Sequence, residues 1–502
     1  MRKRLSAAAV ATCAILGLAC SEQGPVALVH VLGVPPTATT LEAQFRLGVR
    51  SAMSPQTFPA PSGGFGAETS FVVVLPQGST GRLAIDLTAR DPAGCVLASG
   101  SGGQDVSAGA RIDLSIVLSP IGGPCGSGGD GGPLDGSADG EPDGLPPSEV
   151  PHVPTLGAYV GTASLSLDTT TIDTSTLMIT GVTLPTGVSF DVWPQQPSGP
   201  ELAVLHVDGL DVSPGATVTV IGARPLVVIA GQDIMVYGTI DASARGHTPG
   251  PGGYGQGSGA GVGSPGMSTG MHSDSGGGGG GFGRPGAMGG TASGEAVPAI
   301  GGAGGGAYGD PPLTVLEGGS GGGVGSAGTC SPAAAGAGGG AVQFYSRSQI
   351  RIATSGGINV GGDGGGGGIG CPSGNTGGGS GGGSGGALFL QAPRVWNNGT
   401  LAANGGGGGG GAGTQTTAGS GQDGLLSQQP ASGGSSGGAV GGPGGSGGAG
   451  SHEANPGGSV SNPSTGGNAG GGGGGVGRIR VLTRLGFVMT GVVSPDPSVG
   501  NY

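Results

Sequence analysis

Short apolar runs recur in the second half of the chain, separated by corners of glycine, proline or aspartate. Between residues 203 and 242 each run is three to five residues long, and a new run begins every eight to twelve residues. Brief, evenly spaced runs rich in β-branched residues predict a right-handed parallel β-helix (β-solenoid), in which each coil contributes about three strands. The runs that carry this pattern are Val204–Val207, Thr217–Ile221, Leu226–Ala230 and Ile234–Tyr237.

One short phrase occurs in three near-copies, each after an apolar run and each before a glycine tract. Inward residues of a solenoid stack on their equivalents in the coils above and below, so we expect the copies to occupy one corner of successive coils. The copies are Gly238–Ala242, Gly357–Val360 and Gly399–Ala403.

The three copies are followed by inserts of unequal length at about 243–339, 361–385 and 404–475. Inserts at one corner of successive coils predict a glycine-rich flank along one side of a short β-solenoid. We therefore assign a glycine-rich solenoid domain to residues 158–485 and a C-terminal tail to residues 486–502.

Glycine accounts for 129 of the 502 residues, and most of it lies in these inserts. Glycine brings no side chain to a core and loses more conformational entropy on folding than any other residue. The tracts do not hold glycine at every third position over a long run, which excludes collagen. Two alternatives remain: flexible loops, or extended strands of polyglycine type that bond to each other through their backbones.

Residues 25–121 show a different pattern, a strict alternation of apolar and polar positions. Alternation with one polar face is typical of half-buried, antiparallel strands. Five to seven such strands in about 95 residues predict a small immunoglobulin-like β-sandwich. The clearest apolar positions are Leu83, Ile85, Leu87 and Ala89 in one strand, and Ile112, Leu114, Ile116 and Leu118 in another.

Residues 122–157 lack any apolar period and are rich in glycine, proline and aspartate. Five acidic residues between Asp130 and Asp143 have no basic partner, so self-repulsion and proline predict an extended acidic linker. Clustered aspartates also allow a calcium site. The order of ligands in an EF-hand is absent, however, and a solvated spacer is the better interpretation.

The N-terminus carries a targeting signal. Arg2, Lys3 and Arg4 precede an apolar run from Leu5 to Ala19, which indicates a signal peptide over residues 1–19 and is too short for a comfortable membrane span. The sequence Leu16–Cys20 resembles the lipobox of bacterial lipoproteins, although Gly17 stands where that family prefers leucine. The resemblance implies lipidation of Cys20, with residues 20–24 as a tether. Ordinary secretion is the alternative.

Charge and cysteine content agree with an exported protein. Loss of the signal removes three of the basic residues, so the formal charge changes from −12 to −12 − 3 = −15 and no lysine remains. An acidic chain without lysine is not expected to bind nucleic acid. Four cysteines remain besides Cys20, two in each half of the chain. We predict the disulfides Cys95–Cys125 and Cys330–Cys371, with four unpaired thiols as the alternative.

No residue set in the sequence defines a reaction, a cofactor or a metal site. A phosphate-binding Walker loop needs a lysine that the mature chain lacks, and the histidines are scattered. A β-helical polysaccharide lyase or hydrolase needs converging acids. The predicted strands offer few: Asp208, Asp211, Asp233 and Asp241. The aromatic residues Trp193, Tyr237, Phe344, Tyr345 and Trp396 could stack on a sugar, but we expect them in the core.

The glycine tracts and the repeated Gly-x-Ile/Leu-x-Ala/Val phrase, over residues 200–485, resemble glycine-rich surface lipoproteins of Gram-negative bacteria. Their repeats are similar to PE-PGRS-like and hemagglutinin-like repeats, although this chain has no PE-type N-terminus. The resemblance implies surface display or adhesion and no enzymatic role. We expect a non-enzymatic outer-membrane lipoprotein facing the surface, with a surface glycan or another envelope component as partner. The alternative is an exported polysaccharide-binding protein or polysaccharide lyase or hydrolase of the β-helix type.

Overall fold

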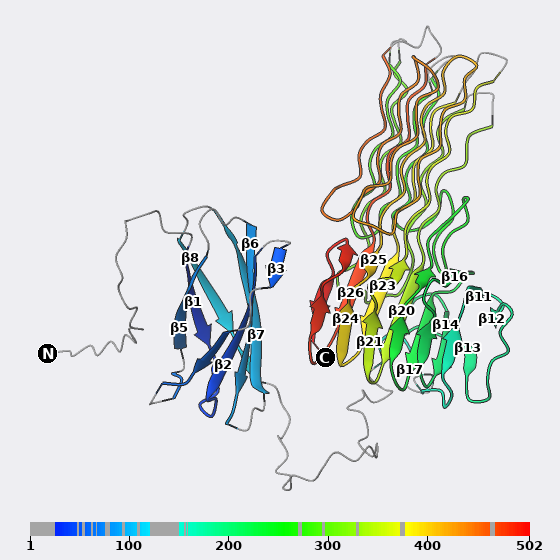
Figure 1. Cartoon of the computed structure of the whole chain (residues 1–502). Helices are drawn as coiled ribbons and strands as arrows, with labels where there is room; N and C mark the ends of the chain where they lie inside the picture. The colour runs from blue at the N-terminus through cyan, green and yellow to red at the C-terminus, as the bar shows by residue number, and fades with distance from the viewer. Residues whose placement is uncertain are drawn as a thin grey trace. The chain divides into compact units, whose positions relative to one another are not determined.

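A computed structural model (Figure 1) describes residues 26–120 and 150–501, apart from short gaps. The chain divides into two compact units, Met1–Ser137 and Ala138–Tyr502, with the division inside the predicted linker. The described residues form β-strands and no α-helix, which confirms the all-β prediction. The gaps are 48–49, 53–55, 62–63, 67, 76–80, 93–95, 108–110, 155–156, 158, 270–273, 294–296, 328–330, 372–376 and 462–466.

The described residues of the N-terminal unit form two sheets. One has the strand order β5-β1-β8, and the other has the order β3-β2-β6-β7-β9, with β4 also paired to β2. The strands are β1 (Val26–Leu32), β2 (Thr40–Leu47), β3 (Arg50–Ala52), β4 (Gln56–Pro59), β5 (Glu68–Val74), β6 (Gly81–Arg90), β7 (Val96–Val106), β8 (Arg111–Val117) and β9 (Ser119–Pro120).

The predicted alternation places side chains correctly in this unit. All eight apolar positions named above in β6 and around β8 are buried in one core, together with Val29 and Phe45. The expectation of purely antiparallel pairing is wrong for β8, which pairs with β1 in parallel, Leu114 opposite Val29. An alternating pattern reports that one face is buried, and it carries no information on the direction of the neighbouring strand.

The second unit contains three long, mainly parallel sheets. Their orders are β10-β15-β18-β21-β24-β27, β12-β11-β16-β19-β22-β25-β28 and β13-β14-β17-β20-β23-β26-β29. The strands are β10 (Leu165–Leu167), β11 (Thr170–Asp173), β12 (Met178–Ile179), β13 (Ser189–Trp193), β14 (Leu202–Val207), β15 (Leu210–Val212), β16 (Thr217–Ile221), β17 (Leu226–Ala230), β18 (Ile234–Val236), β19 (Thr239–Asp241), β20 (Ala341–Ser346), β21 (Gln349–Ile352), β22 (Gly357–Asn359), β23 (Ala387–Gln391), β24 (Arg394–Asn397), β25 (Thr400–Ala402), β26 (Arg478–Leu482), β27 (Phe487–Met489), β28 (Val492–Ser494) and β29 (Ser498–Gly500).

From β14, β15 and β16 onward, neighbouring strands within a sheet are three apart in the chain, so each set of three strands adds one strand to each sheet. This order is compatible with the predicted β-solenoid, and we call each set a coil. The repeated phrase forms β19, β22 and β25, which are neighbours in one sheet as expected.

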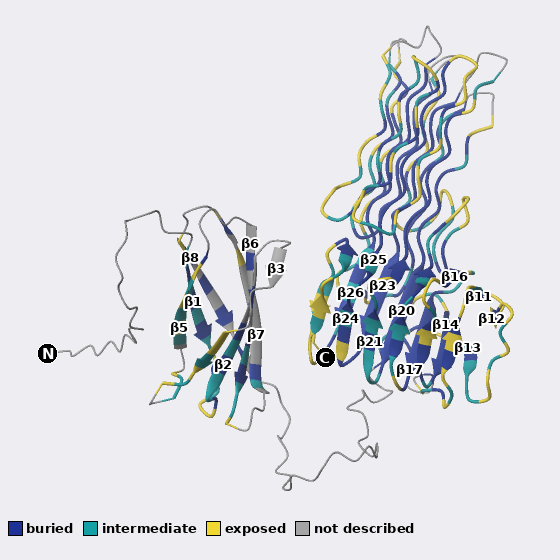
Figure 2. Ribbon diagram, viewed as in Figure 1, coloured by how far each residue is buried: buried dark blue, intermediate teal, exposed yellow. Residues whose placement is uncertain are grey.

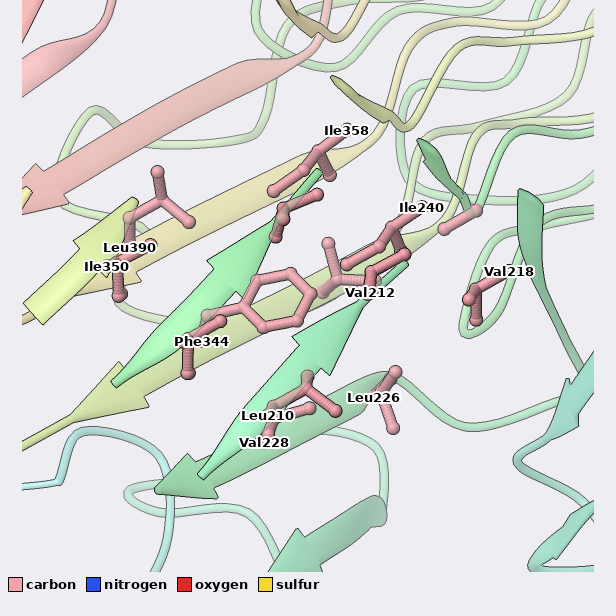
Figure 3. Packing of buried hydrophobic residues seen from close by; sticks show 14 of the residues in the cluster. Leu210, Val212, Val218, Leu226, Val228, Ile240, Phe344, Ile350, Ile358 and Leu390 are labelled. Atoms are coloured by element: carbon pink, nitrogen blue, oxygen red, sulfur yellow. The ribbon is translucent and has the colours of Figure 1, made fainter. Parts of the chain in front are cut away.

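Inward side chains fill the space between the three sheets (Figure 3). They stack from coil to coil in register: Leu205 lies opposite Val228, Val228 opposite Phe344, and Phe344 opposite Leu390. All four are at most 1% exposed. Because each coil buries its apolar face only against its neighbours, the core belongs to the stack and not to any single coil.

Two predicted boundaries of this domain need correction. Strands β27, β28 and β29 extend the three sheets within residues 486–502, so this segment is a further coil and not a tail. At the other end, Val150 and Val153 of the predicted linker are buried against the second unit, in a core that includes Phe389. Short strands and a single apolar pair gave too weak a pattern to detect either feature.

The glycine inserts form an ordered bundle, drawn in Figure 2 as wavy, largely buried segments that extend away from the strands of the coils. Six consecutive amides from Gly276 to Gly281 donate to backbone oxygens at N···O distances between 2.8 and 3.0 Å. Three neighbouring segments supply the acceptors in turn, so every third amide donates to the same segment. The acceptors are, in order, Gly290, Gly379, Ser264, Ala287, Gly382 and Gly261.

A three-residue period is that of an extended helix of the polyproline II type, which has no internal hydrogen bonds. In the segment 377–387, backbone donors and acceptors connect the chain to six neighbouring segments. The inserts therefore adopt the second of the two alternatives, extended strands of polyglycine type. The six pairs are Gly379–Ala469, Ser380–Gly366, Gly381–Gly323, Gly277–Gly379, Gly336–Gly381 and Gly406–Gly383.

Candidate functional site

A groove of about 860 Å³ lies where the sheet of β16, β19 and β22 meets the third glycine insert. One wall is the outer face of that sheet, and the other is the segment 421–426. The lining residues are Thr217, Thr239, Asp241, Ser243, Arg245, Asn359 and Gly421–Leu426.

The polar wall follows from strand alternation. Val218, Ile240 and Ile358 point into the solenoid core, so the residues on either side of them face outward. Register aligns these outward residues in columns across the coils, with Thr217 opposite Thr239 and Asp241 opposite Asn359. The chain thus presents hydroxyl, carboxylate and amide groups at regular spacing along one face.

Asp241 is the most constrained of these groups. Its carboxylate accepts hydrogen bonds from the backbone amide (3.1 Å) and the hydroxyl (2.6 Å) of Ser243. Arg245 forms an ion pair with the second carboxylate oxygen. Asp241 is 4% exposed, whereas the Arg245 side chain is largely exposed. Both carboxylate oxygens of Asp241 are therefore already bonded to residues of the turn that follows β19.

A second carboxyl group lies close to the groove, at the base of the glycine bundle. Asp363 is buried, and its Oδ2 accepts a hydrogen bond from the backbone amide of His247 at 2.7 Å. The ring Nδ1 of His247 lies 3.0 Å from the same oxygen. Burial is the main cause that raises the pKa of Asp363 to about 7, and the nearby Asp423 carboxyl group contributes in the same direction.

Two acids line the groove, Asp241 and Asp423. Asp241 is paired with Arg245, and Asp423 Oδ1 accepts a hydrogen bond from the Gly364 amide at 3.0 Å. Asp233, another acid considered from the sequence, lies outside the groove and accepts hydrogen bonds from Ser348 and Gln349 at 2.6 Å.

The aromatic residues do not form a platform in the groove. Phe344 and Tyr345 are buried in β20, as expected for core positions. The guanidinium carbon of Arg351 lies 5.7 Å from the ring centroid of Trp396, so this partly exposed indole already stacks on a cation. None of these residues lines the groove.

The predicted modification sites lie almost entirely outside the described residues. This holds for Cys20, the proposed lipid site, and for Cys95, Cys125 and Cys330. Cys371 is the one cysteine that the structure describes, and it is disulfide-bonded. The pairing with Cys330 stays a prediction, because Cys330 is not among the described residues.

Two further searches covered the described residues. They contain no group of three or more histidine, cysteine, aspartate or glutamate side chains that could hold a metal ion. Among the same residues, no helix has the length and apolar character needed to cross a membrane.

Sequence reasoning missed the cluster of Asp363, His247 and Asp423. These residues lie in three different inserts, 116 residues apart in the case of His247 and Asp363, and no local motif connects them. The one available signal was an isolated acid within a glycine tract, at Asp363 and again at Asp423. A charged residue surrounded by glycine has no hydrophobic reason to be buried, so burial at such a position indicates a specific partner.

Comparison with known proteins found no match: no family model, no curated protein and no solved structure matches this chain.

Proposed function

We propose that this chain is a non-enzymatic, lipid-anchored protein of the bacterial cell surface with an adhesive or envelope-structural role. The observation that best supports the proposal is the hydrogen-bonded glycine bundle attached to the coils. A bundle joined through backbone groups is stiff along its strands and offers few side chains for chemistry, which suits presentation of a surface rather than catalysis. The resemblance of the repeats to glycine-rich surface lipoproteins points in the same direction.

The proposal includes finer features of the fold. We take the coils to be right-handed, since parallel β-crossovers have that hand in nearly all proteins. We take the N-terminal unit, with its two sheets around one core, to be an immunoglobulin-like sandwich. In the sequence it lies between the proposed lipid site Cys20 and the strands of the coils.

Anchoring is tested with the substitution Cys20→Ala in the full-length chain. The wild-type protein is expected to incorporate a palmitate label and to sediment with the membrane fraction, and the variant is expected to lose both. Protease added to intact cells is expected to digest the wild-type protein, because it faces the surface. A variant that stays membrane-bound with unchanged label contradicts the lipid anchor.

A second candidate function is binding of a polysaccharide, and the polar groove favours it. Ordered columns of hydroxyl, carboxylate and amide groups can bond to successive sugar hydroxyls. The test is a screen of the mature protein against neutral and acidic polysaccharides, with Asp241→Ala as the groove variant and Asp211→Ala on β15 as the control. Binding that only Asp241→Ala weakens supports this candidate. Turnover lost with Asp233→Ala or Asp241→Ala would overturn the non-enzymatic proposal.

Disulfide pairing within each half of the chain is also part of the proposal. Non-reducing peptide mapping of the mature protein is expected to find Cys95 joined to Cys125 and Cys330 joined to Cys371. A peptide that joins Cys95 to Cys330 would contradict the scheme.

A further inference from the structure

A second, smaller cavity lies on the outer face of the sheet that contains β23 and β26, away from the groove described above. Its volume is about 360 Å³, which falls at the low end of the roughly 300–1,000 Å³ typical of small-molecule sites. We call it the Arg480 cavity, after the one lining residue that carries a permanent charge.

Strand alternation explains which side chains of the sheet reach this cavity. The inward residues of β23 and β26 belong to the solenoid core, so Phe389, Arg480 and Leu482 point to the outer face. Register aligns Val227, Gln343, Phe389 and Arg480 in one column across four coils. The column therefore changes from uncharged side chains to a cation at β26.

The walls of the cavity are mainly apolar. A second core covers the outer face of this sheet, and it includes Phe389 together with Val150 and Leu313 from segments outside the strands. Leu482 is only partly buried against that core. Leu313, Phe389 and Leu482 all line the cavity, so a ligand there would contact aliphatic and aromatic groups.

Arg480 has no partner for its charge in the part of the chain that the structure describes. It takes part in none of the ion pairs there, and its buried Nε atom has no hydrogen-bond partner. Burial lowers the pKa of Arg480, and no acidic side chain opposes this effect. A guanidinium group partly withdrawn from water and left unpaired favours the binding of an anion.

The nearby acid Asp310 does not neutralise Arg480. Asp310 acts electrostatically on His152 and on Arg478. Its carboxylate also accepts hydrogen bonds from the backbone amide (2.9 Å) and the hydroxyl (2.5 Å) of Thr314. Its charge is therefore directed to other groups.

The last strand of the sheet holds the Arg480 side chain from one side. Gly500 of β29 lies opposite Leu482 in the ladder, and a Cβ built at Gly500 would overlap Nη2 of Arg480. Only a residue without a side chain lets the backbone approach the guanidinium group this closely. A side chain restrained before the ligand arrives loses less entropy on binding.

We propose that the Arg480 cavity binds a carboxylate carried on an apolar body, with Arg480 as the partner of the carboxylate. Phe389, Leu313 and Leu482 contact the apolar body. A guanidinium group can donate two parallel hydrogen bonds to a carboxylate, and one unpaired cation matches its single negative charge better than the nearly double charge of a phosphate. The carboxylate can belong to a free acid or to the carboxyl end of a peptide.

The test measures binding to the mature protein by saturation-transfer NMR titration, with probes that differ only in the charged group. 4-Phenylbutyrate is expected to bind on the order of 10- to 100-fold more tightly than its neutral amide, because hydrogen bonds to charged groups are lost with the amide. The peptide Gly-Gly-Phe with a free or an amidated carboxyl end is the second pair. The tighter of the two acids identifies the source of the carboxylate.

Three variants and one control locate the binding. Arg480→Met keeps the apolar stem and is expected to bind the acid about as weakly as the amide. Gly500→Ala, which displaces the guanidinium group without removing it, is expected to weaken the acid and not the amide. Arg394→Met, at an exposed arginine on β24 of another sheet, is the matched control and is expected to bind like the wild type. Asp241→Ala changes only the groove, so it is expected to leave this binding unchanged.

Three results would overturn the proposal. One is the absence of binding of both acids to the wild-type protein at millimolar concentration. Another is an acid and an amide that bind equally well. The third is an Arg480→Met variant that folds, as shown by its far-UV circular dichroism, and still binds the acid as tightly as the wild type.

Discussion

Packing of the glycine bundle makes a direct prediction for the substitution Gly381→Ala. Gly381 lies in the central segment 377–387 and is buried. A Cβ built there would lie closer than 3.0 Å to the carbonyl oxygen of Gly278, a separation that real Cβ atoms essentially never show. That oxygen is the acceptor for the Gly323 amide at 2.8 Å, and the Gly323 oxygen accepts in turn from Gly381 at 2.9 Å.

The cost follows from these contacts. The added methyl group must displace a backbone carbonyl, so two buried hydrogen bonds are disrupted. Each buried group left without a partner costs about 1–3 kcal/mol, which gives about 2–6 kcal/mol for two bonds. The lower entropy of the unfolded chain with alanine offsets about 0.4–1 kcal/mol of this. We therefore expect Gly381→Ala to lower the free energy of unfolding by about 1–5.6 kcal/mol.

Gly306→Ala is the matched control, because Gly306 is exposed and a Cβ built there has no atom within 4 Å. The assay is denaturant unfolding followed by far-UV circular dichroism, together with hydrogen exchange of peptides from residues 274–283. Gly306→Ala is expected to leave both nearly unchanged. Equal stability and equal exchange in the two variants would refute the packed arrangement and leave the inserts as flexible loops.

Two further predictions concern the coils. Leu205→Ala removes a fully buried inward side chain and is expected to lower the free energy of unfolding by about 2–5 kcal/mol, whereas Ile221→Ala, at a side chain 41% exposed, is expected to cost much less in the same denaturation assay. Burial is the main cause that lowers the pKa of His152, and it outweighs the opposing effect of the hydrogen bonds to Gln343 and Leu313. Its stabilisation is present above pH 6.5 and is lost as the pH falls through the lowered pKa, so unfolding curves of wild type and His152→Ala are expected to converge on acidification.

The strands of the coils could be predicted because their side chains carry the information. Val228, Phe344 and Leu390 belong to apolar runs that are visible in the sequence, and their stacking follows once the runs are assigned to successive coils. The order of the inserts could not be derived in the same way. It resides in backbone groups that every residue possesses, so a packed glycine tract and a flexible one have the same sequence signature. The contact of His247 with Asp363 depends on that packing and was hidden for the same reason.

The coils also account for how glycine tracts can be ordered at all. Fixing a residue costs about 1–2 kcal/mol of backbone entropy, and a hydrogen bond returns only about 0.5–1.5 kcal/mol net, so a bundle of glycine strands alone is marginal at best. Here each insert begins directly after a strand of the coils. The hydrogen bonds between parallel strands of successive coils continue into the first residues of the insert. The Ala242 amide bonds to Asn359, Val360 to Ala402, and Ala403 to Ser494, each at 2.7–2.8 Å.

Three inserts therefore start in register, with their first residues already paired at the spacing of neighbouring strands. Folding of the apolar coils already brings the ends of the inserts together, so it accounts for most of the entropic cost of assembling these segments. On this argument the bundle depends on the coils, whereas the coils bury their inner core without it. Loosening the stack, as in Leu205→Ala, should then raise hydrogen exchange in the bundle as well as in the coils. Gly381→Ala should raise it in the bundle alone.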